Sequence, residues 1–530
     1  LKQVFSDVKT GDILVMDVPK PSCKNEGILV ETIYSLVSAG TERSLIDFGK
    51  KNLILKAKER PDQVKKVIDK MKTDGVITAV KAAFNKLDEP LPLGYSGVGK
   101  VIEVGKGCIE FKVGDLVAIA GTLHANHAEI NYVPKNLAVK LPSGFENIEE
   151  ASFIALGAVA MQGIRQAEVE LGDKVAVIGL GLLGQIACQI LHGYGNEVIG
   201  IDINDSQYNI GKEYIDHFVN SSEDDAVSNV MNITNGYGVD KILITAATTS
   251  NQPIEFSAEI ARDRAIISMV GVTGMEIPRR SFYEKELTFK LSRSYGPGRY
   301  DETYEEKSID YPIGYVRWTE KRIMEEFIRL IYTKRINMKK LITHNFEIEK
   351  APEAYKMITE NPNKEKYLGV IFSYPNNKEK NKNIIVKSKV KVQDKIGIGL
   401  IGSGNFARNT ILPNLTKIDD FELVGLSTSG STSAGQTVKK YDFKYSTTEY
   451  KKLLEDKDID LIIIATPHNT HAKFAIEALD AGKHAYVEKP LAINMEQLEQ
   501  VKEAYERNSQ HLIVGFNRRF SPFAKWIKEQ

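Results

Sequence analysis

The spacing of apolar residues changes along this chain and divides it into segments. Up to about residue 150, short runs rich in valine and isoleucine, such as 97–104, are separated by glycine and charged residues. This pattern is typical of β-strands. From about 53 to 87, apolar positions instead recur every three or four residues, which indicates helices. We therefore predict a β-rich domain over residues 1–150 that carries a helical insertion at about 53–87.

The next segment, residues 151–334, alternates apolar strands with amphipathic helices. This rhythm predicts a parallel sheet with right-handed crossovers. A helix at about 320–332 and a closing β segment near 367–373 lead the chain back, so that 335–375 completes the first domain. The predicted strands of the parallel sheet are 174–178, 197–201, 241–245 and 265–270.

A second alternation follows a change in composition. Residues 376–395 are polar and lysine-rich, as expected of a linker, with a short β piece at 384–386. Residues 396–530 then repeat the strand–helix rhythm, so the fold class is α/β with two parallel sheets. The predicted strands of the second sheet are 397–401, 422–426, 461–465, 484–487 and 512–515.

Composition limits the possible partners. The 530 residues include 70 Lys plus Arg and 70 Asp plus Glu, and this balance gives no electrostatic case for nucleic acid or an acidic membrane. Three separate cysteines fit a reducing compartment. The longest apolar stretch, 175–191, is interrupted by glycines, and the N-terminus lacks the pattern of a secretory signal. We expect a cytoplasmic protein.

A glycine-rich turn marks a first dinucleotide site. It has the form GxGxxG between a strand and an apolar helix, so backbone amides at the helix start can receive a diphosphate. Asp202 ends the second strand, where its carboxylate can bind the ribose hydroxyls and disfavour a 2′-phosphate, so we predict NAD. Ile203 and Gly271 are further cofactor-binding candidates. The motif consists of Gly179, Leu180, Gly181, Leu182, Leu183 and Gly184.

Residues 10–375 resemble the medium-chain, alcohol-dehydrogenase-like family, on the motifs 94–99, 113–117, 127–129 and 171–175. The resemblance implies a GroES-like β-rich domain followed by a Rossmann domain. Zinc members carry a cysteine before a Gly-Thr-Asp-like turn and a Gly-His-Glu, whereas this chain has Ser38-Ala39-Gly40-Thr41-Glu42 and Gly94-Tyr95-Ser96. We therefore predict no zinc. Without zinc, another group must polarise the substrate carbonyl. Tyr95 could do so as a catalytic residue, or it could be a packed core tyrosine. By resemblance, Thr41 and Glu42 lie near the nicotinamide.

Aromatic and arginine residues are dense between 293 and 318. Flat rings stack on sugars, and arginine forks bind phosphate or carboxylate. The segment is therefore either a sugar-acid or nucleotide-sugar site, or an irregular loop whose tyrosines pack against the inserted helices.

A second glycine motif, of the form GxGxxA, opens the last segment. With the motifs at 465–471, 482–492 and 515–520 it strongly resembles the Gfo/Idh/MocA family of sugar and inositol dehydrogenases, whose later substrate domain has no counterpart here. The resemblance implies a catalytic role for Lys489. We also predict a catalytic role for His471, since it and His468 are expected to line the strand-end crevice where such folds bind ligands. No acid follows the second strand, so NAD and NADP both remain open. The predicted cofactor-binding residues are Gly402, Ser403, Gly404, Asn405, Phe406, Ala407, Ser427, Thr466, Pro467, Asn469, Glu488, Lys489 and Pro490.

The combination resembles bacterial bi-domain oxidoreductases linked to polysaccharide and sugar-nucleotide metabolism. It implies hydride transfer between nicotinamide and a sugar or nucleotide-sugar hydroxyl or carbonyl, by a homo-oligomer. The alternative is a non-catalytic NAD-binding scaffold or redox sensor.

Overall fold

The computed structural model describes residues 1–51, 90–375, 384–385 and 395–529. The predicted insertion at 53–87 therefore lies outside the described residues. The N-terminal domain is built on two sheets, of order β2-β1-β4 and β15-β16-β3-β5-β6-β8, with β7 paired to β3. Its elements are β1 (Lys2–Ser6), β2 (Ile13–Asp17), β3 (Gly27–Val37), α1 (Ala39–Lys50), β4 (Leu91–Pro92), β5 (Ser96–Val104), β6 (Leu116–Ala120), β7 (Ile130–Pro134), β8 (Ala138–Lys140), β15 (Ile342–Glu347), α13 (Ala351–Thr359) and β16 (Gly369–Ser373).

The first Rossmann module is a parallel sheet of order β11-β10-β9-β12-β13-β14. The order reverses at β9, which creates the crevice where such sheets bind ligands. Its elements are α5 (Ile154–Gln166), β9 (Lys174–Ile178), α6 (Leu182–Gly193), β10 (Glu197–Asp202), α7 (Asp205–Gly211), β11 (His217–Asn220), α8 (Ala226–Ile233), β12 (Val239–Ile244), α9 (Gln252–Ile260), β13 (Ala261–Met269), α10 (Arg279–Glu284), β14 (Thr288–Leu291), α11 (Glu302–Glu305) and α12 (Glu320–Tyr332).

The second Rossmann module repeats this topology in the order β20-β19-β18-β21-β22-β23, with β17 antiparallel at the β20 edge. Its elements are β17 (Ile384–Ile385), β18 (Ile396–Ile401), a π-helical turn (Ala407–Ile411), α14 (Leu412–Leu415), β19 (Phe421–Ser427), α15 (Ser431–Tyr441), β20 (Tyr445–Thr447), α16 (Lys451–Glu455), β21 (Leu461–Ile464), α17 (His471–Asp480), β22 (His484–Glu488), α18 (Met495–Arg507), β23 (Leu512–Gly515) and α19 (Pro522–Glu529).

These sheets confirm the predicted fold class. Strand cores are fully buried, because helices cover both faces of each parallel sheet, and the sequence therefore reads as continuous apolar runs. The short strands β11, β14 and β20 were not predicted, since their residues show no such run. Among the described residues, no helix combines the length and the apolarity needed to cross a bilayer.

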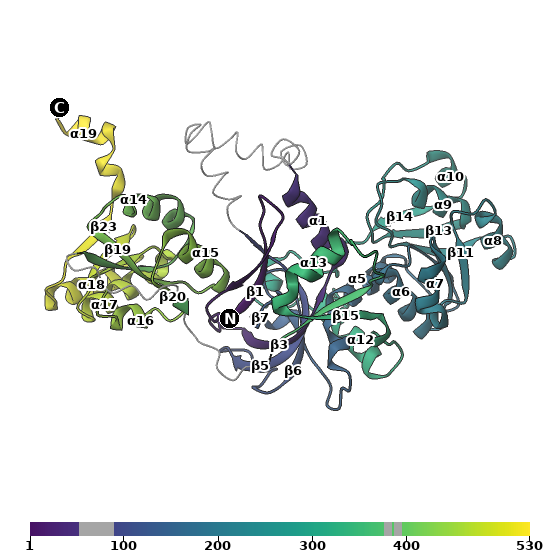
Figure 1. The fold of residues 1–530 in the computed structure, drawn as a ribbon, viewed down its shortest axis with the longest axis horizontal. Helices are drawn as coiled ribbons and strands as arrows, with labels where there is room; N and C mark the ends of the chain where they lie inside the picture. The colour runs from purple at the N-terminus through teal and green to yellow at the C-terminus, as the bar shows by residue number, and fades with distance from the viewer. Residues whose placement is uncertain (52–89, 376–383, 386–394, 530) are drawn as a thin grey trace.

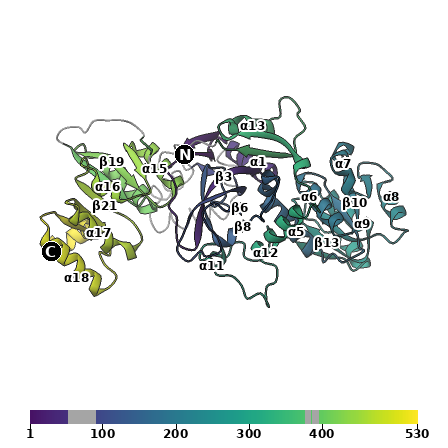
Figure 2. The ribbon, with the colours of Figure 1, turned by 90° about the horizontal axis from the view of Figure 1, so that it is seen from below.

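The N-terminal domain lies between the two Rossmann modules in both views (Figures 1 and 2). The second module touches it through two hydrogen bonds. The Ser22 hydroxyl donates to the Ser429 carbonyl (3.1 Å), and the Thr448 hydroxyl donates to the Lys20 carbonyl (2.7 Å). The two predicted cofactor sites therefore belong to modules separated by a third domain.

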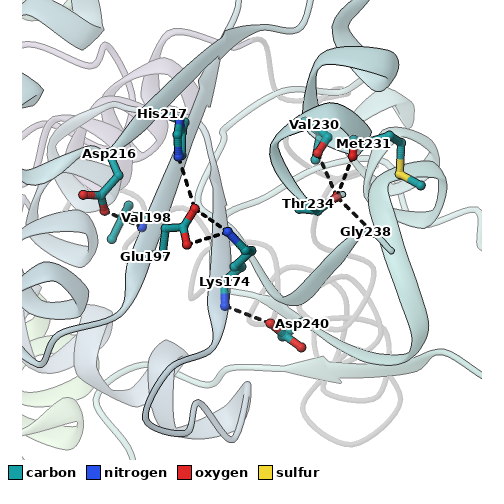
Figure 3. A network of polar contacts seen from close by, with 10 residues as sticks. All are labelled: Lys174, Glu197, Val198, Asp216, His217, Val230, Met231, Thr234, Gly238 and Asp240. Atoms are coloured by element: carbon teal, nitrogen blue, oxygen red, sulfur yellow. Dashed lines mark hydrogen bonds and ion pairs between the residues drawn. The ribbon is translucent and has the colours of Figure 1, made fainter. Parts of the chain in front are cut away.

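Charged residues join the amino ends of the strands in the first Rossmann module (Figure 3). The Lys174 ammonium lies 2.5 Å from the Glu197 carboxylate, which also pairs with His217 at 3.1 Å. The Lys174 amide donates to Asp240 (2.8 Å). The network connects β9, β10, β11 and the start of β12 at the edge opposite the glycine turn, so it orders the sheet without occupying the ligand crevice.

Candidate dinucleotide and substrate sites

The glycine turn of the first module shows which glycines the fold itself requires. Gly179 has φ +95, and a Cβ there would lie 2.7 Å from the Ala246 backbone. A Cβ on Gly184 would lie 2.0 Å from the Gly179 carbonyl oxygen. Gly181, in contrast, has φ −65, and no described atom lies within 4 Å of a Cβ built there. The fold therefore gives no reason for glycine at 181, whereas an external ligand at the helix start would.

The second module repeats this contrast. Gly402 has φ +96, and its Cβ would lie 2.5 Å from the Ala465 carbonyl oxygen, while the space around a Cβ on Gly404 is open. Ala407 is fully buried, as close helix–strand packing requires. Ser403 is 4% exposed, and its hydroxyl is without a hydrogen-bond partner among the described residues. Asn405 and Phe406 are exposed at the helix start.

Few glycines share this property. Of the glycines that the structure describes, only four combine an open Cβ direction with a φ outside the left-handed region, and they are Gly40, Gly181, Gly314 and Gly404. Two are the middle glycines of the two motifs. Gly40 directly precedes Thr41 in the first turn of α1.

Asp202 closes the first glycine turn from the end of β10. Its carboxylate accepts from the Leu180 amide (2.7 Å) and the Asn204 amide (3.0 Å). Each oxygen keeps a lone pair, and the side chain is half-buried at the crevice. Ile203 follows with its side chain 71% exposed, a flat apolar surface at the position expected for the adenine. Packing explains why residue 271 is glycine, because a Cβ there would lie 2.1 Å from the Ala246 carbonyl oxygen.

The carboxyl edge of the second sheet gathers the other predicted residues. Ser427 is buried at the end of β19, and its carbonyl accepts from the Gly402 amide (2.8 Å). The Thr466 and Thr470 hydroxyls lie 2.7 Å apart, with Pro467, His468 and Asn469 exposed between them. Glu488 is buried and accepts from the Tyr486 hydroxyl (3.0 Å). Lys489 is exposed before Pro490, and no contact between described residues engages its ammonium.

Tyr95 lies in the N-terminal domain beside two other hydroxyl groups. Its hydroxyl donates to Ser38 Oγ (2.6 Å). Burial raises the pKa of Tyr95, hydrogen bonds from Ser38 and Thr41 oppose this, and Glu42 adds to the rise. The phenol therefore carries its proton at neutral pH. In this structure the proton is donated to Ser38, so donation to a substrate oxygen would require the hydroxyl to turn from Ser38 to the substrate.

Two side chains at this site differ from the zinc ligands of the medium-chain family. The two positions that hold ligands in zinc members carry Ala39 and Tyr95, and neither offers the thiolate or imidazole that zinc binds. Within the described part of the chain, no three His, Cys, Asp or Glu side chains converge as a metal site would require.

Glu42 is buried in a hydrogen-bond network of the N-terminal domain. It is 1% exposed and accepts from the Ser38 amide (3.2 Å) and from the Tyr355 hydroxyl. Its other neighbour is His127 Nε2 (3.3 Å), whose Nδ1 contacts Ser35 Oγ (2.6 Å). This network fixes the start of α1 and with it Ser38 and Thr41. Its members are far apart in sequence, so no local pattern could have revealed it.

The aromatic and arginine segment has a packed part and an exposed part. Tyr295 and Tyr304 are buried, whereas Tyr300 is 56% exposed. The guanidinium carbons of Arg293 and Arg299 lie 4.4 and 4.1 Å from the centre of the Tyr300 ring. Arg299 is paired with Glu305 (2.5 Å), but Arg293 is exposed and has no described anionic partner.

This exposed part lies at the boundary of two domains. Arg299 also donates to Thr122 of the N-terminal domain (3.3 Å), and Asn136 donates to the Tyr304 carbonyl (3.0 Å). Tyr300 lies near enough to Tyr95 to interact with it electrostatically. The structure thus brings together Tyr95 and the segment at 293–300, which are about 200 residues apart in the sequence. We call Arg293, Arg299 and Tyr300 the arginine–tyrosine platform.

The fold and these turns define a protein with two dinucleotide-binding Rossmann domains. Residues 396–516 match the model of the oxidoreductase family with an NAD-binding Rossmann fold, and residues 183–310 match that of the zinc-binding dehydrogenases. The chain thus carries two modules that match two oxidoreductase families. The match to the zinc-binding dehydrogenase model, at 183–310, includes neither 38–42 nor 94–96, where zinc ligands would lie.

Curated relatives match over a limited length. The chain is 32% identical over 130 residues to the uncharacterized oxidoreductase YrbE of Bacillus subtilis, covering 24% of this chain and 38% of that protein. It is 35% identical over 130 residues to 4-carboxy-2-hydroxymuconate-6-semialdehyde dehydrogenase of Sphingobium, covering 24% and 41%. The chain therefore spans about two fifths of the length of these curated relatives.

Solved dehydrogenases share the fold of the larger part. Galactitol-1-phosphate dehydrogenase from Escherichia coli is 20% identical, covering 70% of this chain and 100% of that chain at a TM-score of 0.54. An alcohol dehydrogenase from Thermus sp. ATN1 is 19% identical, covering 71% and 100% at a TM-score of 0.54. These likenesses show the medium-chain dehydrogenase fold.

Proposed function

We propose that the chain is a zinc-independent, nicotinamide-dependent oxidoreductase that binds one dinucleotide in each Rossmann module. The observation that carries this proposal is the pair of open middle glycines, Gly181 and Gly404. Both stand where a diphosphate would meet backbone amides, and the fold does not need glycine at either position. Both matching family models are of oxidoreductases, which supports the oxidoreductase part of this proposal.

In the first module, residues 179–184 and Asp202 would hold NAD. A bound nicotinamide supplies a hydride acceptor or donor. Tyr95 would donate a hydrogen bond to the oxygen of the reacting hydroxyl or carbonyl, because its raised pKa keeps the phenol protonated. Ser38 and Thr41 orient that hydroxyl, and the buried Glu42 network fixes Ser38.

The arginine–tyrosine platform would bind the substrate. Arg293 has no described anionic partner, so its guanidinium could pair with a phosphate or carboxylate, and this suits a sugar that carries an anionic group. Sugar acids and nucleotide sugars meet this description. The competing function is a non-catalytic NAD-binding scaffold. It predicts no turnover of any sugar acid or nucleotide sugar.

Turnover of such a substrate should depend on Tyr95. We expect NADH formation or consumption with at least one member of a panel of nucleotide sugars and sugar acids. The Tyr95→Phe variant should lose about 10²- to 10⁴-fold in kcat, the contribution of a positioned proton donor, with NADH affinity unchanged. Absorbance of the nicotinamide measures both. Tight NADH binding without turnover of the panel would support the scaffold instead.

Cofactor choice in the first module should depend on Asp202. In the Asp202→Asn variant the amide oxygen can still accept from the Leu180 amide, but the charge that binds ribose and repels a 2′-phosphate is lost. We expect NAD to bind roughly 10- to 100-fold more weakly, the value of a charge-assisted hydrogen bond, and NADP to bind relatively better. Calorimetry with both cofactors measures the ratio. An unchanged ratio would show that Asp202 does not face the ribose.

In the second module, Lys489 would lie beside the nicotinamide and substrate. Its free ammonium at the carboxyl edge could stabilise a developing alkoxide. Ser427 leaves room for either NAD or NADP.

A further inference from the structure

The two nitrogens of the His471 ring both face backbone carbonyl oxygens. Nδ1 lies 2.7 Å from the Pro490 oxygen, and Nε2 lies 2.8 Å from the Thr466 oxygen. A carbonyl oxygen can only accept a hydrogen bond, so each nitrogen must carry a hydrogen to make its contact. A neutral imidazole has one N–H and would leave one of these short contacts without a proton. Both bonds together therefore require the imidazolium form.

The ring has no room for another partner. His471 is 1% exposed as the first residue of α17. The other ionisable groups on the two loops that it joins are His468, whose ring centre lies 5.6 Å away, and Glu488 and Lys489 next to Pro490. The sequence analysis expected a catalytic role for His471; in this structure both of its ring nitrogens face backbone carbonyl oxygens.

The two carbonyls belong to the two loops of the predicted cofactor site. Thr466 follows β21 and begins the turn that contains Pro467 and Asn469, while Pro490 directly follows Lys489. We propose that His471 is an imidazolium clamp that ties these loops together, and that it is a positioning residue for Lys489. The effect on Lys489 rests on the proposed function of the second module, whereas the clamp itself does not.

The protonation state tests the clamp directly. We expect nitrogen NMR of the full chain, labelled only in histidine, to include at pH 7 the signal of a His471 ring with hydrogens on both nitrogens. That signal should disappear in His471→Gln. It should persist in His511→Gln, which changes an exposed histidine at the opposite edge of the same sheet. A His471 signal with a single N–H would overturn the proposal.

The positioning role is tested by binding. In the Gly181→Val background, where only the second site is expected to remain, His471→Gln should weaken NADH or NADPH binding roughly 10-fold, the value of a lost charge-assisted hydrogen bond. His511→Gln should bind normally. Unchanged affinity in His471→Gln would refute the positioning role. If the Gly181→Val parent bound neither cofactor, the proposed function of the second module would fail, while the NMR result would still decide the clamp.

Discussion

Replacing either middle glycine by valine should remove one dinucleotide site and leave the other intact. A side chain at 181 or 404 meets no described atom of the protein, but it would occupy the position of the diphosphate. We expect Gly181→Val and Gly404→Val each to lower the binding stoichiometry from two to one. The affected site should lose at least about 100-fold in affinity, equivalent to two charge-assisted hydrogen bonds. Calorimetry with NADH and NADPH measures both quantities.

Two control variants separate ligand exclusion from misfolding. A side chain at 314 also points into open space, but residue 314 is far from both glycine motifs in the sequence. The Gly314→Val variant should therefore bind two dinucleotides. Gly184→Val places a Cβ 2.0 Å from a carbonyl oxygen and should destabilise the first module itself. Unfolding of Gly181→Val and Gly404→Val should match the unmodified chain within about 0.5 kcal/mol. Full binding at two sites in both variants would refute the proposed cofactor sites.

The free energy of unfolding should fall steeply as the pH rises, because of Glu320. This first residue of α12 is fully buried, and neither carboxylate oxygen has a partner among the described residues. Burial raises the pKa of Glu320 to about 9, the Glu305 carboxylate adds to the rise, and Arg299 opposes it. The pKa of Glu320 is therefore higher in the folded than in the unfolded protein. In acid the carboxyl is protonated in both states, so its ionisation costs the folded protein no stability. The penalty grows as pH rises from about 4.5 to about 9, at about 1.4 kcal/mol per pH unit.

The Glu320→Gln variant should lose this slope because glutamine does not ionise. We expect its free energy of unfolding, from denaturant titrations, to gain on that of the unmodified chain by about 3 kcal/mol between pH 6 and pH 8, at about 1.4 kcal/mol per pH unit. Glu302→Gln, which changes an exposed glutamate in the same segment, should leave the slope unchanged. Equal slopes in the unmodified chain and Glu320→Gln would mean that Glu320 is charged and paired in the folded protein.

Much of the fold could be predicted because buried parallel strands appear as apolar runs. The residues of β9, β18 and β22 and the full span of α12 follow this pattern or the helical one. The edge strands β11, β14 and β20 could not be found, since strands at or near an edge need fewer apolar residues. The order of strands also needed the pairing that the structure shows, although a βα alternation already limits the sheet to a few topologies.

The sequence alone determined the two glycine turns, Asp202 and the Lys489 turn, because each is a local motif of backbone and spacing. Only the tertiary structure separated Gly181 and Gly404 from glycines that packing requires, since that distinction depends on atoms from other strands. The same holds for Tyr95 near Tyr300, for Glu42 beside His127 and for His471 between two carbonyls. Burial and hydrogen-bond partners, which set protonation and charge, come from residues that meet only after the chain has folded.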